Sequence, residues 1–179
     1  MKGIVFTTLG QMIEEQMGMD EWNRLVEYSE LPSGGAYTAA DNYDDAELNT
    51  LVAGLAQMTG TPAPGLIRHF GKYALGQFAR LYPALFRNHD ARSFLKNVHR
   101  VIHQEVRKLY PNAELPDFEY QEPDASTLVM RYASPRKLCH FAEGMIDGTA
   151  DYFGEDIDIE HSSCMHNGDD HCRLELRFI

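Results

Sequence analysis

The chain has 179 residues, of which 44% are hydrophobic and 24% are charged, which predicts one globular domain with a buried hydrophobic core. The formal net charge of −11 argues against a nucleic acid or an anionic membrane as a partner, because an acidic surface would be repelled by either.

The N-terminal segment MKGIVFTTLGQMIEEQ has an apolar run that is too short for a signal peptide, and no later segment reaches membrane-spanning length. We therefore expect a cytoplasmic protein with reduced thiols. Its three cysteines cannot form a closed set of disulfides, so metal binding or redox sensing is favoured over a disulfide framework.

Apolar residues at three- and four-residue steps predict helices in the N-terminal part of the chain. Asp20 is the expected cap of the second helix, Asp44 or Asp45 the expected start of the third, and Gly60 its expected end. The predicted helices cover residues 2–18, 21–31, 45–58, 65–82 and 91–110.

The helix predicted over 91–110 begins after Asp90, ends before Pro111 and carries one apolar face. His99 and His103 lie one turn apart beside that face. A histidine in such a place is most often a core or boundary residue. On the helix alone that interpretation is favoured. The alternative is an imidazole that binds a metal or a haem iron, and it depends on what the rest of the chain supplies.

After Pro111 the apolar period changes from 3.6 to 2. Strands are predicted over 118–121 and 127–132, followed by a helix with Ser134 as its N-cap that runs to Phe153. Two further strands, 156–165 and 171–178, are expected around an Asn167-Gly168 hairpin. The predicted class is therefore α+β, with a helical N-terminal subdomain packed on a C-terminal subdomain of antiparallel sheet plus helices.

The segment Tyr132-Ala133-Ser134-Pro135-Arg136 places two hydroxyls and a guanidinium at one strand-to-helix corner. An arginine fork binds a carboxylate in bidentate fashion, and hydroxyls can occupy the remaining lone pairs. The segment thus suits a ligand with carboxylates or phosphates. As a bare five-residue pattern, however, a helix cap at Ser134 and a solvated Arg136 are the favoured explanation.

Three features together resemble the H-NOX family of haem-nitric oxide/oxygen-binding domains: MKGIVFTTL at the start, a helix histidine seven residues before Tyr110-Pro111, and Y-x-S-x-R at Tyr132 to Arg136. The resemblance covers nearly the whole chain and implies a single domain, 1–179. It divides this domain into a distal helical subdomain, about 1–62, and a proximal α+β subdomain, about 63–179, with haem b between them.

The resemblance also assigns residues to the haem. His103 would be the ligand of the iron, and Tyr132, Ser134 and Arg136 would hold the propionates, whereas His99 does not match the ligand position. Pro116 resembles the family's proline that presses on the porphyrin, although it also simply separates helix from strand. Ile4 and Phe78 are the expected distal-pocket residues.

Oxygen-binding members of the family use a distal tyrosine shortly after Y-x-S-x-R, where this chain has Phe141 or Ala142. Without a hydroxyl donor, the pocket should favour nitric oxide over O2, with CO bound more weakly than NO. The family's usual signal is rupture of the bond between iron and histidine when NO binds, which would free His103 and let its helix shift.

The expected function is therefore that of a non-enzymatic NO sensor that regulates a separate protein. The resemblance implies that this partner is a sensor histidine kinase, in two-component signalling, or a diguanylate cyclase/phosphodiesterase. An enzyme, including a haem enzyme, is the alternative, but the sequence shows no nucleophile motif, phosphate loop or open-site metal triad. A third interpretation is a zinc-binding, thiol-redox-responsive interaction module.

A second group of residues, Cys139, His161, Cys164 and Cys172, has the composition of a closed tetrahedral zinc site. Some bacterial H-NOX proteins resemble this arrangement and carry such a zinc, so a structural zinc is expected. Three buried reduced thiols, or a Cys164–Cys172 disulfide formed under oxidation, are the alternatives. His166 and His171 are rival nitrogen ligands, less well placed beside Gly168.

Overall fold

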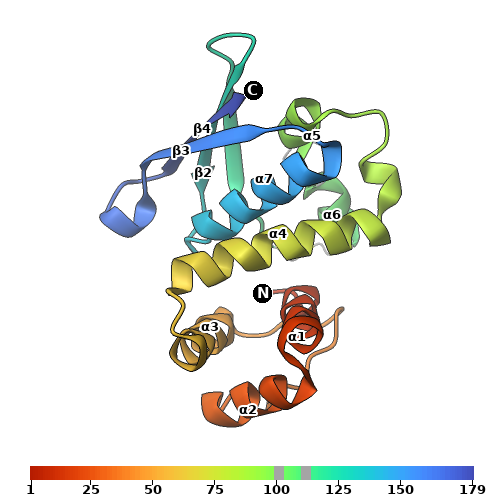
Figure 1. Cartoon of the computed structure of the whole chain (residues 1–179), viewed down its shortest axis with the longest axis vertical. Helices are drawn as coiled ribbons and strands as arrows, with labels where there is room; N and C mark the ends of the chain where they lie inside the picture. Colours follow the sequence, from red (N-terminus) through yellow and green to blue (C-terminus); the bar gives the residue numbers. More distant parts are fainter. Residues whose placement is uncertain (99–102, 110–113) are drawn as a thin grey trace.

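The computed structural model describes residues 1–98, 103–109 and 114–179, which fold into helices and one four-stranded antiparallel sheet (Figure 1). This confirms the predicted α+β class. The helices are α1 (Gly3–Met17), α2 (Met19–Ser29), α3 (Asp45–Thr59), α4 (Ala63–Leu81), α5 (Ala91–Asn97), α6 (His103–Leu109) and α7 (Cys139–Phe153). The strands are β1 (Asp117–Gln121), β2 (Thr127–Ala133), β3 (Ile157–Ser163) and β4 (Cys172–Phe178), and short 3-10 helices cover Pro83–Leu85 and Met165–Asn167.

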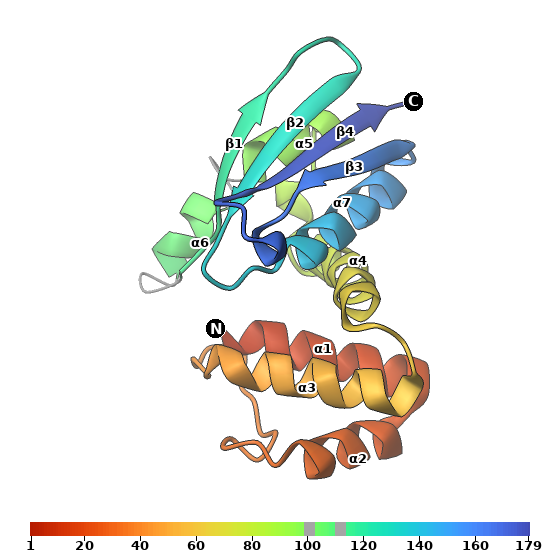
Figure 2. The same ribbon diagram turned by 90° about the vertical axis from the view of Figure 1, so that its left-hand side faces the viewer.

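The sheet has the strand order β1-β2-β4-β3. Side chains on β4 alternate between the two faces of the sheet as the sequence predicts, because Cys172, Leu174 and Leu176 are fully buried and the residues between them are not. These side chains pack in one hydrophobic cluster with α5 and α7, which cover the same face of the sheet (Figure 2). The register sets Tyr132 between Phe118 on β1 and Cys172 on β4.

A second hydrophobic cluster joins α1, α2, α3 and one side of α4. α4 lies between this helical part and the sheet with α7 (Figure 1). Phe70 and Ala74 of α4 belong to the helical cluster, whereas Leu75 and Ala79 belong to the cluster beneath the sheet. One helix therefore holds the two parts of the molecule together.

α4 and α7 approach each other backbone to backbone. A Cβ atom added to Gly144 would lie 1.9 Å from the carbonyl oxygen of Arg68, and one added to Gly71 would lie 2.2 Å from that of Phe141. Glycine is required at both positions because no side chain fits between the helices. An ion pair of 2.6 Å between Arg68 and Asp147 closes the same interface.

Most predicted helix ends are confirmed. The side chain of Asp44 accepts a hydrogen bond from the backbone N–H of Ala46 at 2.9 Å, so Asp44 caps α3. Gly60 and Gly154 follow α3 and α7 with φ values of 70° and 68°, in the left-handed region that glycine tolerates. Asp90 forms a reciprocal capping box with Ser93 at the start of α5.

Two predicted caps are wrong. Asp20 lies inside the first turn of α2, because the chain leaves α1 at Gly18 and re-enters a helix at Met19. Ser134 does not start a helix. Its hydroxyl accepts a hydrogen bond from the N–H of Arg136 in a local turn, and Lys137, with φ 51°, keeps the chain out of the helix until Cys139.

Two other predictions differ in detail. The connection from β3 to β4 is longer than the expected Asn167-Gly168 hairpin, because a short 3-10 helix precedes Gly168. α5 and α6 cover parts of the helix predicted over 91–110, while His99 and Pro111 lie outside the described residues. Within the described parts of the chain, no helix is long and apolar enough to cross a membrane.

Candidate functional sites

The Tyr132-to-Arg136 corner is built from buried polar groups. Tyr132, only 3% exposed, lies near the end of β2, and its hydroxyl accepts a hydrogen bond from the backbone N–H of Leu138 at 3.0 Å. Burial raises the pKa of Tyr132 to about 12, so the phenol keeps its proton. Ser134 is also buried. The corner therefore holds two hydroxyls in fixed positions beside Arg136.

Arg136 joins this corner to the helical part of the molecule. Its Nε lies 2.6 Å from a carboxylate oxygen of Asp45 on α3, and the other oxygen of Asp45 lies 2.7 Å from the N-terminal amine of Met1. A second guanidinium nitrogen lies 2.9 Å from Glu114. Burial alone would raise the pKa of Asp45, but hydrogen bonds from Met1 and Arg136 outweigh burial and hold that pKa below its ordinary value.

A cavity of about 380 Å³ borders this ion-pair network. Because its walls come from the start of the chain, α3 and the corner, the cavity lies where the helical part meets the strand-to-helix turn. Its lining residues are Met1, Asp45, Leu48, Asn49, Glu114, Pro135, Arg136 and Leu138. A guanidinium in the wall, only 15% exposed, makes this a place suited to a carboxylate.

His103 lies on α6 and is half-buried. Its ring centroid is 5.7 Å from that of Phe118 on β1, and Phe118 packs edge-on against Tyr132 at 5.5 Å. The imidazole and the tyrosine of the predicted site therefore both contact the ring of Phe118.

The predicted pocket residues Ile4, Phe78, Phe141 and Pro116 are all half-buried. Phe78 and Phe141 pack against the helical cluster, and the ring of Phe141 lies 5.1 Å from that of Phe70.

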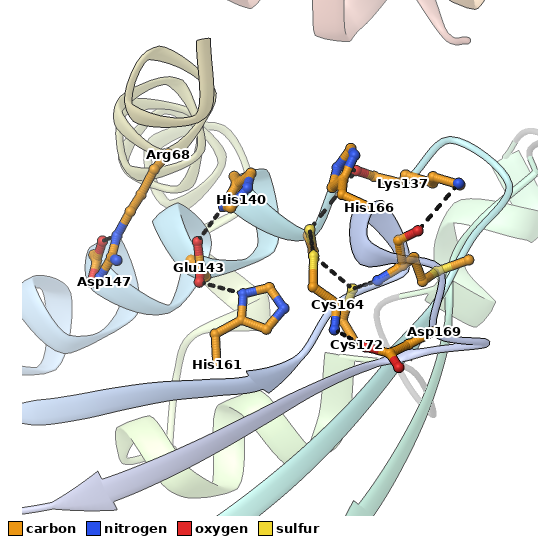
Figure 3. A network of polar contacts seen from close by, with 12 residues as sticks. Arg68, Lys137, His140, Glu143, Asp147, His161, Cys164, His166, Asp169 and Cys172 are labelled. Atoms are coloured by element: carbon orange, nitrogen blue, oxygen red, sulfur yellow. Dashed lines mark hydrogen bonds and ion pairs between the residues drawn. The ribbon is translucent and has the colours of Figure 1, made fainter. Parts of the chain in front are cut away.

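The second predicted group is also brought together. Cys139 begins α7, Cys164 follows β3 and Cys172 begins β4, and the sulfur of Cys164 lies 3.8 Å from that of Cys139 and 4.0 Å from that of Cys172 (Figure 3). The three cysteines and His161 each offer one ligand atom, and these four atoms all lie within 4.8 Å of one another. All three thiols are free, and burial with the neighbouring sulfurs raises the pKa values of Cys139 and Cys172.

The rival histidines make other contacts. His166 Nε2 is 2.8 Å from the carbonyl oxygen of Lys137, and His171 contacts Asp170 and Arg131.

The sequence did not reveal Glu143, which is buried on α7 and contacts His140 and His161. The one signal in the sequence was its position four residues after Cys139, which sets both side chains on one face of α7.

The family model for haem-NO-binding proteins matches residues 2–161. The chain belongs to the H-NOX family. The H-NOX protein from S. oneidensis, solved in its Fe(II)NO ligation state, is 36% identical, has a TM-score of 0.94, and the match covers 100% of this chain and 99% of that one. No curated protein matches the chain.

Two further solved H-NOX structures extend the comparison. The Fe(II)CO form of the Shewanella oneidensis domain is 36% identical, with a TM-score of 0.91 and coverage of 100% of this chain and 99% of that one. The unliganded Fe(II) form of an A71G mutant from K. algicida is 30% identical, with a TM-score of 0.91 and coverage of 100% and 97%. H-NOX domains bind haem and act as gas sensors.

The residues of this H-NOX chain fit a haem. The donor set comprises one half-buried imidazole at His103, the neighbouring rings of Phe118 and Tyr132, and a half-buried guanidinium at Arg136 that lines a cavity. Imidazole is a common axial ligand of haem iron, and arginine pairs with carboxylates such as the propionates. His103 lies on α6, Phe118 on β1 and Arg136 after β2, so these groups come from separate elements of the fold.

Proposed function

We propose that this H-NOX domain is a haem-based nitric oxide sensor. His103 would ligate the iron, and Tyr132, Ser134 and Arg136 would hold the propionates of haem b. The observation that carries the proposal is Arg136, a half-buried guanidinium in the wall of a cavity, within an H-NOX fold. A propionate is expected to replace Glu114, which is 76% exposed, as the second carboxylate on Arg136.

Ligand preference follows from the side chains around the pocket. A ferrous haem supplies the iron that binds a diatomic gas. Ile4, Phe78, Phe141 and Pro116 would form apolar walls that offer no hydrogen-bond donor, and bound O2 depends on such a donor more than NO does. Tyr73 and Tyr37 pack against the helical cluster, and their hydroxyls donate to Glu15 at 2.7 Å and to Glu47 at 2.6 Å. The site should therefore bind NO, CO more weakly, and no O2.

The response to NO is proposed to start at His103. Its imidazole packs against Phe118 of β1 and, as the iron ligand, would connect α6 to the haem. Once released from the iron, His103 would leave α6 free to shift against the sheet. Residues 1–62 would act as the distal subdomain and residues 63–179 as the proximal one, with the haem between them.

The protein is proposed to act in the cytoplasm on a separate partner and to have no catalytic activity. The partner class is a sensor histidine kinase, in two-component signalling, or a diguanylate cyclase/phosphodiesterase. A nucleic acid or an anionic membrane surface is disfavoured by the net charge of −11.

A structural zinc is proposed at Cys139, His161, Cys164 and Cys172. This proposal rests on the convergence of three sulfurs and one imidazole, which is the composition of a closed tetrahedral zinc site. The same geometry favours the second candidate function, a thiol-redox-responsive interaction module, because oxidation of the thiols would eject the metal.

The test of the sensor is an absorption spectrum of the purified ferrous protein under argon, NO, CO and air. The expected result is a haem Soret band that shifts to a five-coordinate form under NO, shifts under CO, and shows no oxygen complex in air. Well-folded protein that stays colourless after haem is supplied during expression would overturn the proposal. In that case, only the metal-site candidate would remain.

A further inference from the structure

We propose that Glu143 is the positioning residue of the Cys139–His161–Cys164–Cys172 site, and that it fixes which nitrogen of His161 binds the metal. This inference rests on the metal site proposed above. It adds a residue that lies outside the four ligands and acts on the metal through one of them.

Glu143 is 5% exposed and lies one turn after Cys139 on α7. One of its carboxylate oxygens is 2.8 Å from Nδ1 of His161, and the other is 2.8 Å from Nδ1 of His140. Figure 3 shows the carboxylate between the two rings. A buried carboxylate held by two imidazoles has little freedom to turn, so it fixes the orientation of both rings.

The contact decides the tautomer of His161. An ionised carboxylate only accepts hydrogen bonds, so Nδ1 must carry the hydrogen and Nε2 must present its lone pair. Nε2 of His161 is buried without a hydrogen-bond partner. In Figure 3 this nitrogen is turned toward Cys164 and Cys172. A metal ion among the sulfurs would satisfy it, and a carboxylate behind a ligating imidazole strengthens the imidazole as a ligand.

Glu143 also ties the site to the centre of the fold. The next residue, Gly144, packs against the backbone of Arg68 on α4. The charge of Glu143 raises the pKa of Arg68, after the larger contribution from Asp147. The Glu143–His161 contact thus connects the proposed metal ligand on β3 with the closely packed pair of α4 and α7.

The first test compares wild-type protein with Glu143→Gln in metal-affinity measurements. Zinc is titrated against a chromophoric chelator, and cobalt(II) is used as a spectroscopic probe of the same site. Glutamine keeps the size of the side chain but offers one oxygen acceptor in place of two, so zinc should bind about 10–100-fold more weakly and the cobalt d–d bands should change. Asp147→Asn is the matched control, because Asp147 lies one turn further on α7 and pairs with Arg68. It should bind both metals as wild type does.

The outcomes separate the two proposals. Equal zinc affinity and equal cobalt spectra for wild type and Glu143→Gln would overturn the positioning role and leave the metal site intact. A wild-type protein that binds neither zinc nor cobalt would overturn both.

The second test needs no substitution, so it holds even where Glu143→Gln fails to fold. A long-range proton–nitrogen spectrum of zinc-loaded wild-type protein reports which ring nitrogen of His161 bears hydrogen. The expected result is a protonated Nδ1 and a metal-bound Nε2. Metal binding through Nδ1 would contradict the proposal.

Discussion

Arg136 and Asp45 are 91 residues apart in sequence, yet Nε of Arg136 lies 2.6 Å from a carboxylate oxygen of Asp45. This ion pair connects α3 of the helical part to the corner that follows β2. The arginine proposed to hold a propionate is therefore also a link between the two parts of the molecule. A ligand that binds this guanidinium would therefore change the ion pair between Arg136 and Asp45 on α3.

Replacing Asp45 with asparagine tests this link through the pH dependence of stability. The pKa of Asp45 lies below its ordinary value of 3.8. The ionised carboxylate therefore stabilises the fold above that value, and this stabilisation is lost as the pH falls through the lowered pKa. Wild type should be more stable than Asp45→Asn at neutral pH, and the difference should shrink below about pH 4. Urea unfolding at several pH values measures the free energy of unfolding of both proteins. If it depended on pH in the same way in both, the proposed link would be contradicted.

Replacing Arg136 with alanine should lower haem retention. The variant loses the half-buried guanidinium beside the cavity, whereas Arg131→Ala, the control, removes an arginine on β2 that pairs with Glu119. The ratio of Soret to protein absorbance after purification measures retention. A ratio unchanged in Arg136→Ala, or lowered equally in both variants, would count against the propionate-binding role.

Much of the fold is predictable from the sequence because its signals are local. The caps at Asp44 and Asp90, the glycines that end α3 and α7, and the alternation in β4 each depend on a few neighbouring residues. The Ser134 cap fails for a physical reason. The left-handed conformation of Lys137 turns the chain before α7 begins. Residues 134–137 therefore form a turn instead of the first turn of the helix.

The sites were predictable only in part. Cysteines and a Y-x-S-x-R motif are visible as residue types, so the sequence alone is enough to name them. Glu143 could not be assigned in this way, because its partner His161 comes from a strand that follows α7. The contact between Arg136 and Asp45 likewise depends on how α3 meets the corner, which no local pattern specifies.

The backbone contact between α4 and α7 predicts opposite effects for two glycine substitutions. Gly144→Ala would place a Cβ 1.9 Å from the carbonyl oxygen of Arg68, so the helices must separate, at a cost of about 1–3 kcal/mol. Gly76→Ala on α4 meets nothing within 4 Å and should be neutral or stabilising by up to about 1 kcal/mol. Thermal unfolding of both variants checks this. Equal effects on the midpoint would show that the helix contact is not a tight constraint.

The central claim is that His103 holds the haem iron, and His103→Gly tests it most directly. The measurement is the haem absorbance of the purified variant, with and without free imidazole during expression. We expect the variant to lose its haem without imidazole and to retain haem when imidazole occupies the vacated place. A His103→Gly protein that keeps its haem without imidazole, with the wild-type spectrum, would contradict the role of His103 as the iron ligand.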